Sequence, residues 1–132
     1  MDNILYINAC CRENSRTNEL AQHLIGKLNG EVQTVNLYEE NLRAVDTKAL
    51  LKREALAKDG KTDDESLSLA KQFSQADTVV IAAPYWDLMF PAVVKLYFES
   101  VTVSGLTFVY GENGNYSAEM LKIYGPYKEG HI

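Results

Sequence analysis

The sequence has little of several features that mark specialised classes of protein. Its 132 residues include only 3 prolines, and its 13 Lys and Arg residues are outnumbered by 18 Asp and Glu residues. Because collagen-like and proline-rich disordered chains need a much higher proline content, the composition excludes both and indicates a compact domain. The net charge of -5 gives no overall positive field to attract a polyanion, so we expect no nucleic acid partner.

Long apolar runs and cysteine frameworks are also missing. The longest apolar stretches, such as residues 78–86, are well short of the roughly 18–20 residues that cross a bilayer, and we expect no membrane partner. The only cysteines, Cys10 and Cys11, are adjacent and close no useful disulfide loop. Reduced thiols, together with an N-terminus without a basic signal region, predict a cytoplasmic protein. His23 and His131 are far apart and complete no metal-ligand spacing, so we expect no metal.

Apolar runs and helical periods alternate along the chain. Residues 4–9 and 78–83 are typical of parallel strands buried on both faces, and residues 32–37 of an edge strand. The expected helices cover residues 15–29, residues 46–58, a segment that opens with a capping box at Thr62 and carries Leu67, Ala70 and Phe73, and residues 91–101. This order predicts an α/β doubly wound parallel sheet, with strand order beginning 2-1-3, in one domain over residues 1–132.

In such a sheet, ligands bind beyond the carboxyl ends of the strands where the strand order reverses. The loop after the first strand leads into a helix and holds Arg12, Ser15, Arg16 and Thr17. Hydroxyls, guanidinium groups and free amides at a helix start suit a phosphate. Alternatively, the hydroxyls only cap the helix and the arginines are solvated surface charges. Neither a Gly-x-Gly-x-x-Gly nor a Gly-Lys-Ser/Thr motif occurs, so no dinucleotide or nucleoside triphosphate loop is predicted.

The loop after the third strand is unusually aromatic for a surface segment. It reads Pro84, Tyr85, Trp86, Asp87, Leu88, Met89, Phe90, Pro91. Such side chains can sandwich a flat aromatic ligand while backbone amides of the loop bond to its polar edge. The alternative is that they pack as a core plug or as a contact between subunits.

Together these motifs resemble the flavodoxin-like NAD(P)H-dependent oxidoreductases, which include FMN-dependent quinone and azo reductases. The resemblance spans residues 3–114 and rests on residues 11–17, residues 83–91 and the Gly-Leu-Thr-Phe-Val-Tyr motif at residues 105–110. The residues that it implies for the FMN phosphate are Ser15, Arg16 and Thr17, with Arg12 and the Cys11 backbone. Those that it implies for the isoalloxazine ring are Pro84, Tyr85, Trp86, Asp87 and Leu88.

The resemblance also implies a flavodoxin-like fold and a reaction that needs no side-chain nucleophile. NAD(P)H would reduce FMN, and a quinone, azo compound or similar small-molecule electron acceptor would take the electrons. A separate observation concerns assembly: the helix at residues 91–101 is apolar almost all round, whereas only one helix face can pack on a sheet. We therefore also expect a homodimer.

The C-terminal segment departs from the family pattern. Residues 115–132 contain no β-branched run long enough for a buried strand, and each βαβ unit takes roughly 30 residues. The C-terminal strands are therefore expected to be missing and residues 115–132 to be atypical. One alternative is therefore that the chain is an inactive, truncated flavodoxin-like fragment.

A second alternative is an enzyme of another class. Cys10, five intervening residues, Arg16 and Thr17 match the Cys-x5-Arg-Ser/Thr loop of the low-molecular-weight tyrosine phosphatases. There Cys10 would be a thiolate nucleophile and Arg16 would bind the phosphoryl oxygens. Against this, the loop lacks glycine, and Glu13 would repel an oxyanion.

Overall fold

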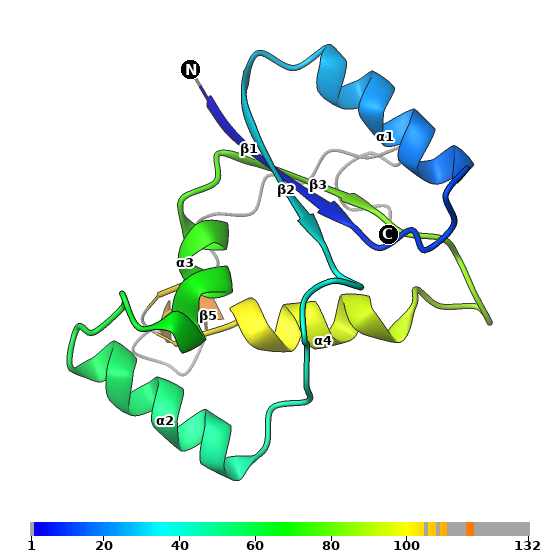
Figure 1. The fold of residues 1–132 in the computed structure, drawn as a ribbon. Helices are drawn as coiled ribbons and strands as arrows, with labels where there is room; N and C mark the ends of the chain where they lie inside the picture. Colours follow the sequence, from blue (N-terminus) through cyan, green and yellow to red (C-terminus); the bar gives the residue numbers. More distant parts are fainter. Residues whose placement is uncertain (1, 105, 108, 111–115, 118–132) are drawn as a thin grey trace.

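A computed structural model describes residues 2–104, 106–107, 109–110 and 116–117. Its main sheet consists of three parallel strands, β1 (Asp2–Asn8), β2 (Gly30–Asn36) and β3 (Thr78–Ala82), in the order β2-β1-β3 (Figure 1). The predicted strand order 2-1-3 is confirmed. β2 is the predicted edge strand, with four consecutive exposed residues.

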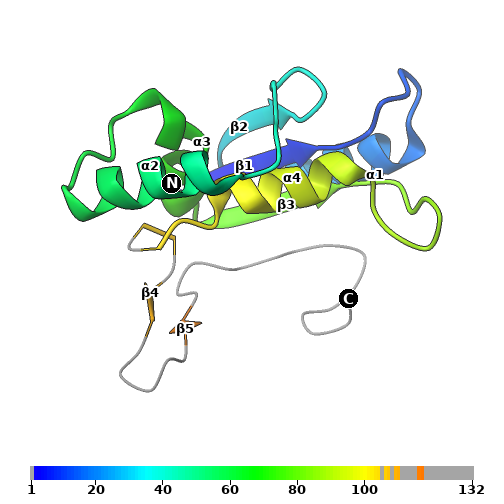
Figure 2. The same cartoon turned by 90° about the horizontal axis from the view of Figure 1, so that it is seen from below.

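Helices cover both faces of this sheet (Figures 1 and 2). α1 (Arg16–Gly26) packs on one face, and α3 (Ser68–Ser74) and α4 (Ala92–Val101) pack on the other. Alternate residues of β1 supply the two cores: Ile4 and Tyr6 lie on the α1 side, whereas Leu5 and Ile7 lie on the α3 and α4 side. Since all four are at most 2% exposed, β1 is buried on both faces, as its unbroken apolar run predicts. Among the described residues, no helix has the length and apolarity needed to cross a membrane.

The connection from β2 to β3 carries α2 (Thr47–Lys58) and the short 3-10 helix η1 (Glu65–Leu67) before α3. Asp46 caps α2, because its carboxylate accepts a hydrogen bond of 2.9 Å from the Ala49 N–H. The expected capping box at Thr62 is wrong: Asp64 caps η1 instead, accepting from the Ser66 N–H at 3.0 Å. The expected buried face of the next helix, at Leu67, Ala70 and Phe73, is confirmed.

The apolar side chains of α4 are mostly used within the chain. Val94, Tyr97 and Val101 are buried, and Val93 and Phe98 pack half-buried against the same core. The helix therefore has less apolar surface left for a second copy than its sequence suggests, and the homodimer stays a prediction.

Beyond α4, β4 (Val109–Tyr110) and β5 (Tyr116–Ser117) form a two-residue antiparallel pair apart from the main sheet. In the described part of the chain, β3 pairs with β1 alone. Two residues of the 105–110 motif, Gly105 and Phe108, lie outside the described residues. So does most of the segment 115–132 that we expect to be atypical.

The start of β2 makes a close backbone approach that gives a first testable prediction. A Cβ added at Gly30 would lie 2.3 Å from the carbonyl oxygen of Asp2, whereas a Cβ added at Gly26 would have nothing within 4 Å. Because backbone must shift, we expect Gly30→Ala to lower the free energy of unfolding by about 1–3 kcal/mol. Gly26→Ala is the matched control and should not lower it. Urea unfolding measures both, and equal losses would contradict the prediction.

Candidate functional site

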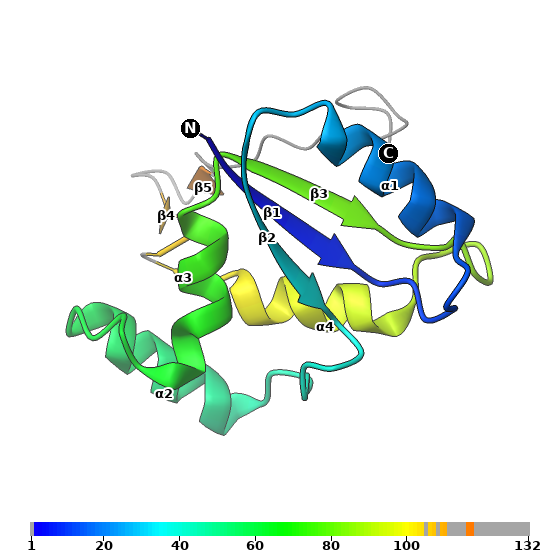
Figure 3. The ribbon, with the colours of Figure 1, turned by 45° about the horizontal axis from the view of Figure 1, so that its top comes forward.

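The carboxyl ends of β1 and β3 are joined at one edge of the sheet. The Ala9 N–H donates to the Ala82 carbonyl at 2.8 Å, and the Cys10 thiol donates to the same oxygen at 3.5 Å. The loop that leads into α1 and the loop that leads into α4 leave the sheet here and lie side by side (Figures 1 and 3). The structure thus brings the two predicted loops together at the point where the strand order reverses.

Ser15 organises the first of these loops as the N-cap of α1. Its hydroxyl oxygen accepts from the Asn18 N–H at 3.1 Å, and its carbonyl accepts from the Glu19 N–H at 3.1 Å. The amides of Arg16 and Thr17 have no partner among the described residues. The Ser15 hydroxyl also keeps its own hydrogen, since the cap uses only its oxygen. The start of α1 therefore presents N–H and O–H donors at the positive end of the helix dipole.

The other predicted residues of this loop surround that helix start. Cys11, Arg12 and Arg16 are exposed, and Thr17 is half-buried in the first turn of α1. Neither arginine forms an ion pair with a described residue. The exposed guanidinium groups are thus free to turn towards an anion at the helix start.

Tyr38 lies at the same edge and was not predicted as a site residue from the sequence. The end of β2 is held to β1 by a 3.0 Å bond from the Leu37 N–H to the Asn8 carbonyl, which places Tyr38 next to Cys11. Partial burial, and then the Cys11 thiol, raise the pKa of the Tyr38 phenol. Periodicity could not reveal this contact because both residues lie in loops, but the position of Tyr38 just after a predicted parallel strand was a usable signal.

A second missed group lies beneath the helix start. The Tyr6 hydroxyl donates to Asn18 Oδ1 and so connects β1 to the first turn of α1. The spacing of Asn18, three residues after the cap, was the only local sign of this link.

The second predicted loop is a tight turn. Trp86 and Met89 exchange backbone hydrogen bonds of 2.6 Å and 2.7 Å, with Asp87 at φ 50° and Leu88 at φ 66° between them. Two central residues with positive φ define a type I′ turn. Pro84 before this turn is half-buried.

Apolar side chains of this turn face solvent. The exposed ones are Tyr85, Trp86, Leu88, Met89 and Phe90. The rings of Tyr85 and Phe90 meet edge to face with their centroids 6.2 Å apart. Within the described residues these side chains do not form a core plug, and an exposed apolar cluster of this kind is typical of a binding surface.

The strain in this turn gives a second prediction. A leucine at positive φ costs roughly 1–2 kcal/mol, and Leu88 is 80% exposed, so its side chain contributes little packing in return. We expect Leu88→Gly to raise the free energy of unfolding by about 1 kcal/mol. Leu51→Gly, at a similarly exposed position inside α2, should lower it by about the same amount. Thermal unfolding measures both, and a loss in both variants would contradict the prediction.

The geometry of Cys10 does not support the phosphatase alternative. The residue is 8% exposed and packs with Val80 and Ala82 in the core beneath α1. Its thiol donates to the Ala82 carbonyl, whereas a nucleophile must face the bound phosphoryl group.

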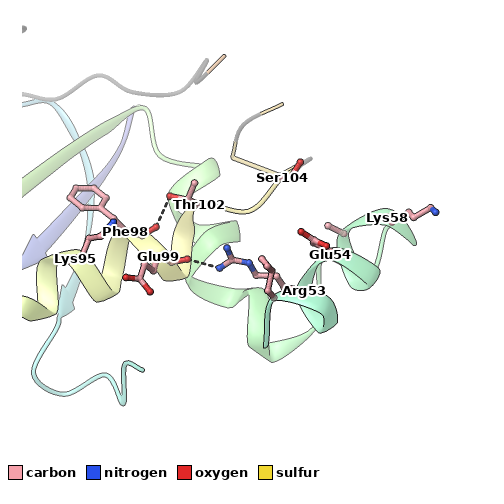
Figure 4. A pocket seen from close by; sticks show the side chains of 10 residues that line it. Arg53, Glu54, Lys58, Lys95, Phe98, Glu99, Thr102 and Ser104 are labelled. Carbon is pink, nitrogen blue, oxygen red and sulfur yellow. Dashed lines mark hydrogen bonds between the residues drawn. The ribbon is translucent and has the colours of Figure 1, made fainter. Parts of the chain in front are cut away.

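A pocket of about 730 Å³ lies elsewhere, between α2 and the second half of α4 (Figure 4). Its lining mixes cations with anions, and Arg53 is engaged within it, donating to the Glu99 carbonyl at 2.6 Å. Because α4 begins beside the aromatic loop, this pocket is separate from the two loops. No group of three or more His, Cys, Asp or Glu side chains that could hold a metal occurs in the part of the chain that the structure describes.

Comparisons with known proteins indicate the family to which this chain is similar. A family model described as "Flavodoxin-like fold" matches residues 2–125. Over 121 residues the chain is 35% identical to a protein of Coprothermobacter proteolyticus and 37% identical to one of Clostridium acetobutylicum, named "FMN-dependent NADH:quinone oxidoreductase" and "FMN-dependent NADH:quinone oxidoreductase 2". Each alignment covers 86% of this chain and 60% of the relative. The chain thus spans about three fifths of the length of these curated relatives.

Among solved structures, an azoreductase of Bacillus anthracis superimposes with a TM-score of 0.69 at 27% identity. The match covers 86% of this chain and 62% of the azoreductase.

Proposed function

Because the chain belongs to the flavodoxin-like fold family, we propose that it contributes the FMN-binding edge of an NAD(P)H-dependent oxidoreductase. Bound there, FMN would supply hydride chemistry between NAD(P)H and a quinone, azo compound or similar small acceptor. The observation that carries the proposal is the meeting of a capped helix start and an exposed aromatic turn at one edge of the sheet. The similarity to quinone oxidoreductases and to an azoreductase supports the two acceptor classes.

The donors at the start of α1 fit a phosphate monoester. Ser15 and Thr17 offer hydroxyl hydrogens, and the unpartnered amides belong to Arg16 and Thr17. The guanidinium groups of Arg12 and Arg16 add charge, and the Cys11 backbone lies in the same loop. Hydrogen bonds to a charged acceptor are about twice as strong as neutral ones, so this set of donors suits a dianion.

The aromatic turn fits the flat ring of a flavin. Pro84 and Tyr85 lead into the turn, and Trp86 is bonded across it to Met89. The amides of Asp87 and Leu88, at its tip, have no partner among the described residues and remain donors for polar ring atoms. The turn would thus bind the flavin ring, exclude water from one side of it and donate hydrogen bonds to its polar edge.

The same exposed turn supports a homodimer. A second copy lying over the loop would bury apolar side chains that a monomer leaves in water.

The state of the cysteines supports a cytoplasmic location. Both are free thiols, and the reducing conditions of the cytoplasm keep thiols free.

The experiment that tests the proposed function is a flavin titration of the purified protein. FMN should bind with quenching of its fluorescence and more tightly than riboflavin, which lacks the phosphate. In the absence of oxygen, continuous NADH oxidation should then require both FMN and a quinone or azo acceptor. Equal affinities for FMN and riboflavin, or no binding of either, would reject the proposal.

A further inference from the structure

Tyr6 is the polar member of an otherwise apolar core. It lies on β1, faces α1 and is 1% exposed, among Ile4, Ile25 and Val80. A buried hydroxyl costs free energy unless it is hydrogen-bonded, and this one donates to Asn18 Oδ1 in the first turn of α1. Burial, and then the electrostatic effect of the neighbouring Cys10, raise the pKa of Tyr6 to about 12, so the phenol keeps the proton that this bond needs.

Asn18 joins this bond to the helix cap. Its backbone N–H donates to the Ser15 hydroxyl oxygen at 3.1 Å, and the Gln22 amide donates to Asn18 Oδ1 at 3.5 Å. One residue therefore connects the buried strand, the cap and the next helical turn. The Asn18 N–H occupies one lone pair of the Ser15 hydroxyl oxygen, so the hydroxyl hydrogen stays available for another acceptor.

We infer that Tyr6 and Asn18 are positioning residues that fix the first turn of α1 against β1 and so aim its donors at the phosphate. The inference rests on the proposed function, in which that turn binds the FMN phosphate. Neither side chain needs to touch the ligand. Tyr6 holds Asn18, Asn18 holds Ser15, and the amides of Arg16 and Thr17 follow the same turn. A helix start held in this way loses less conformational freedom when it binds an anion than one that is free to rock.

The test compares FMN with riboflavin, since only FMN carries the phosphate. Titrations use the full chain with Tyr6→Phe, with Asn18→Ala and with both substitutions together. Asn18→Ala keeps the backbone N–H that Ser15 accepts, so the cap itself remains. We expect each single variant to weaken FMN binding about three- to tenfold and to leave riboflavin binding unchanged. The double variant should lose no more FMN affinity than the more strongly affected of the two single variants, because both substitutions break the same hydrogen bond.

The matched control is Tyr97→Phe, which removes a buried hydroxyl from the opposite face of the sheet. That hydroxyl has no hydrogen-bond partner among the described residues, so its loss should change neither affinity. If Tyr6→Phe does not fold, Asn18→Ala, on the half-buried side of α1, decides the question alone.

The possible results separate the two proposals. A parent that prefers FMN and variants that keep the full preference would overturn the positioning role and leave the proposed function standing. Equal loss of FMN and riboflavin would also overturn it, since that pattern indicates general loosening of the fold. A parent without preference for FMN would overturn both.

Discussion

Replacing Ser15 and Thr17 together with alanine is expected to weaken FMN binding by a factor between about one hundred and about ten thousand. The double variant removes two hydroxyl donors, and each hydrogen bond to a charged group contributes roughly 1.5–3 kcal/mol. Since about 1.4 kcal/mol corresponds to a tenfold change in affinity, the two losses multiply. Flavin fluorescence titration of parent and variant measures the effect.

Loss of the helix cap must be separated from loss of the donors. Ser15 also caps α1, so its removal is expected to lower the free energy of unfolding by about 1 kcal/mol. Asp46→Ala is the matched control, because it removes the side-chain cap of α2 away from the two loops. We expect it to cost similar stability and to leave FMN affinity unchanged. A double variant that binds FMN like the parent would show that the phosphate is held elsewhere.

The sheet was predictable because its pattern is set by burial. Residues 4–7 of β1 and 79–82 of β3 are apolar without alternation, which is typical of strands covered on both faces. The cap of the segment that leads into α3 was less predictable. Thr62 and Asp64 both precede suitable amides, and the choice between them is decided by a 3-10 turn that no periodic pattern reports.

The site was predictable in its position but not in its internal contacts. Strand order alone places both loops at one edge of the sheet. The bond from Tyr6 to Asn18 and the contact of Tyr38 with Cys11 depend on how loops and helix settle on the sheet. The type I′ turn was hidden as well, because Asp87 and Leu88 lack the Asn-Gly pair that usually announces it.

Tyr97→Glu is expected to lower the free energy of unfolding by about 3–5 kcal/mol, because it leaves an unpaired charge in the core. Tyr97 is 0% exposed, and its ring meets Phe73 edge to face at 6.3 Å. Burial, and then the charge of Glu40, already raise the pKa of the Tyr97 phenol, and both would disfavour a carboxylate there. Lys95→Glu, on the exposed side of the same helix, is the control and should change stability little.

The pH dependence of the Tyr97→Glu variant identifies the cause of its instability. Burial raises the pKa of the introduced carboxyl in the folded state above its unfolded value of about 4.3. The variant should therefore gain stability relative to the parent as the pH falls towards about 4, where both states bind the proton, and should lose it as the pH rises through the raised folded pKa. Urea unfolding of variant and parent at several pH values measures the difference. A constant difference in stability across pH would assign the loss to packing alone, and parent-like stability at neutral pH would place Tyr97 outside the core.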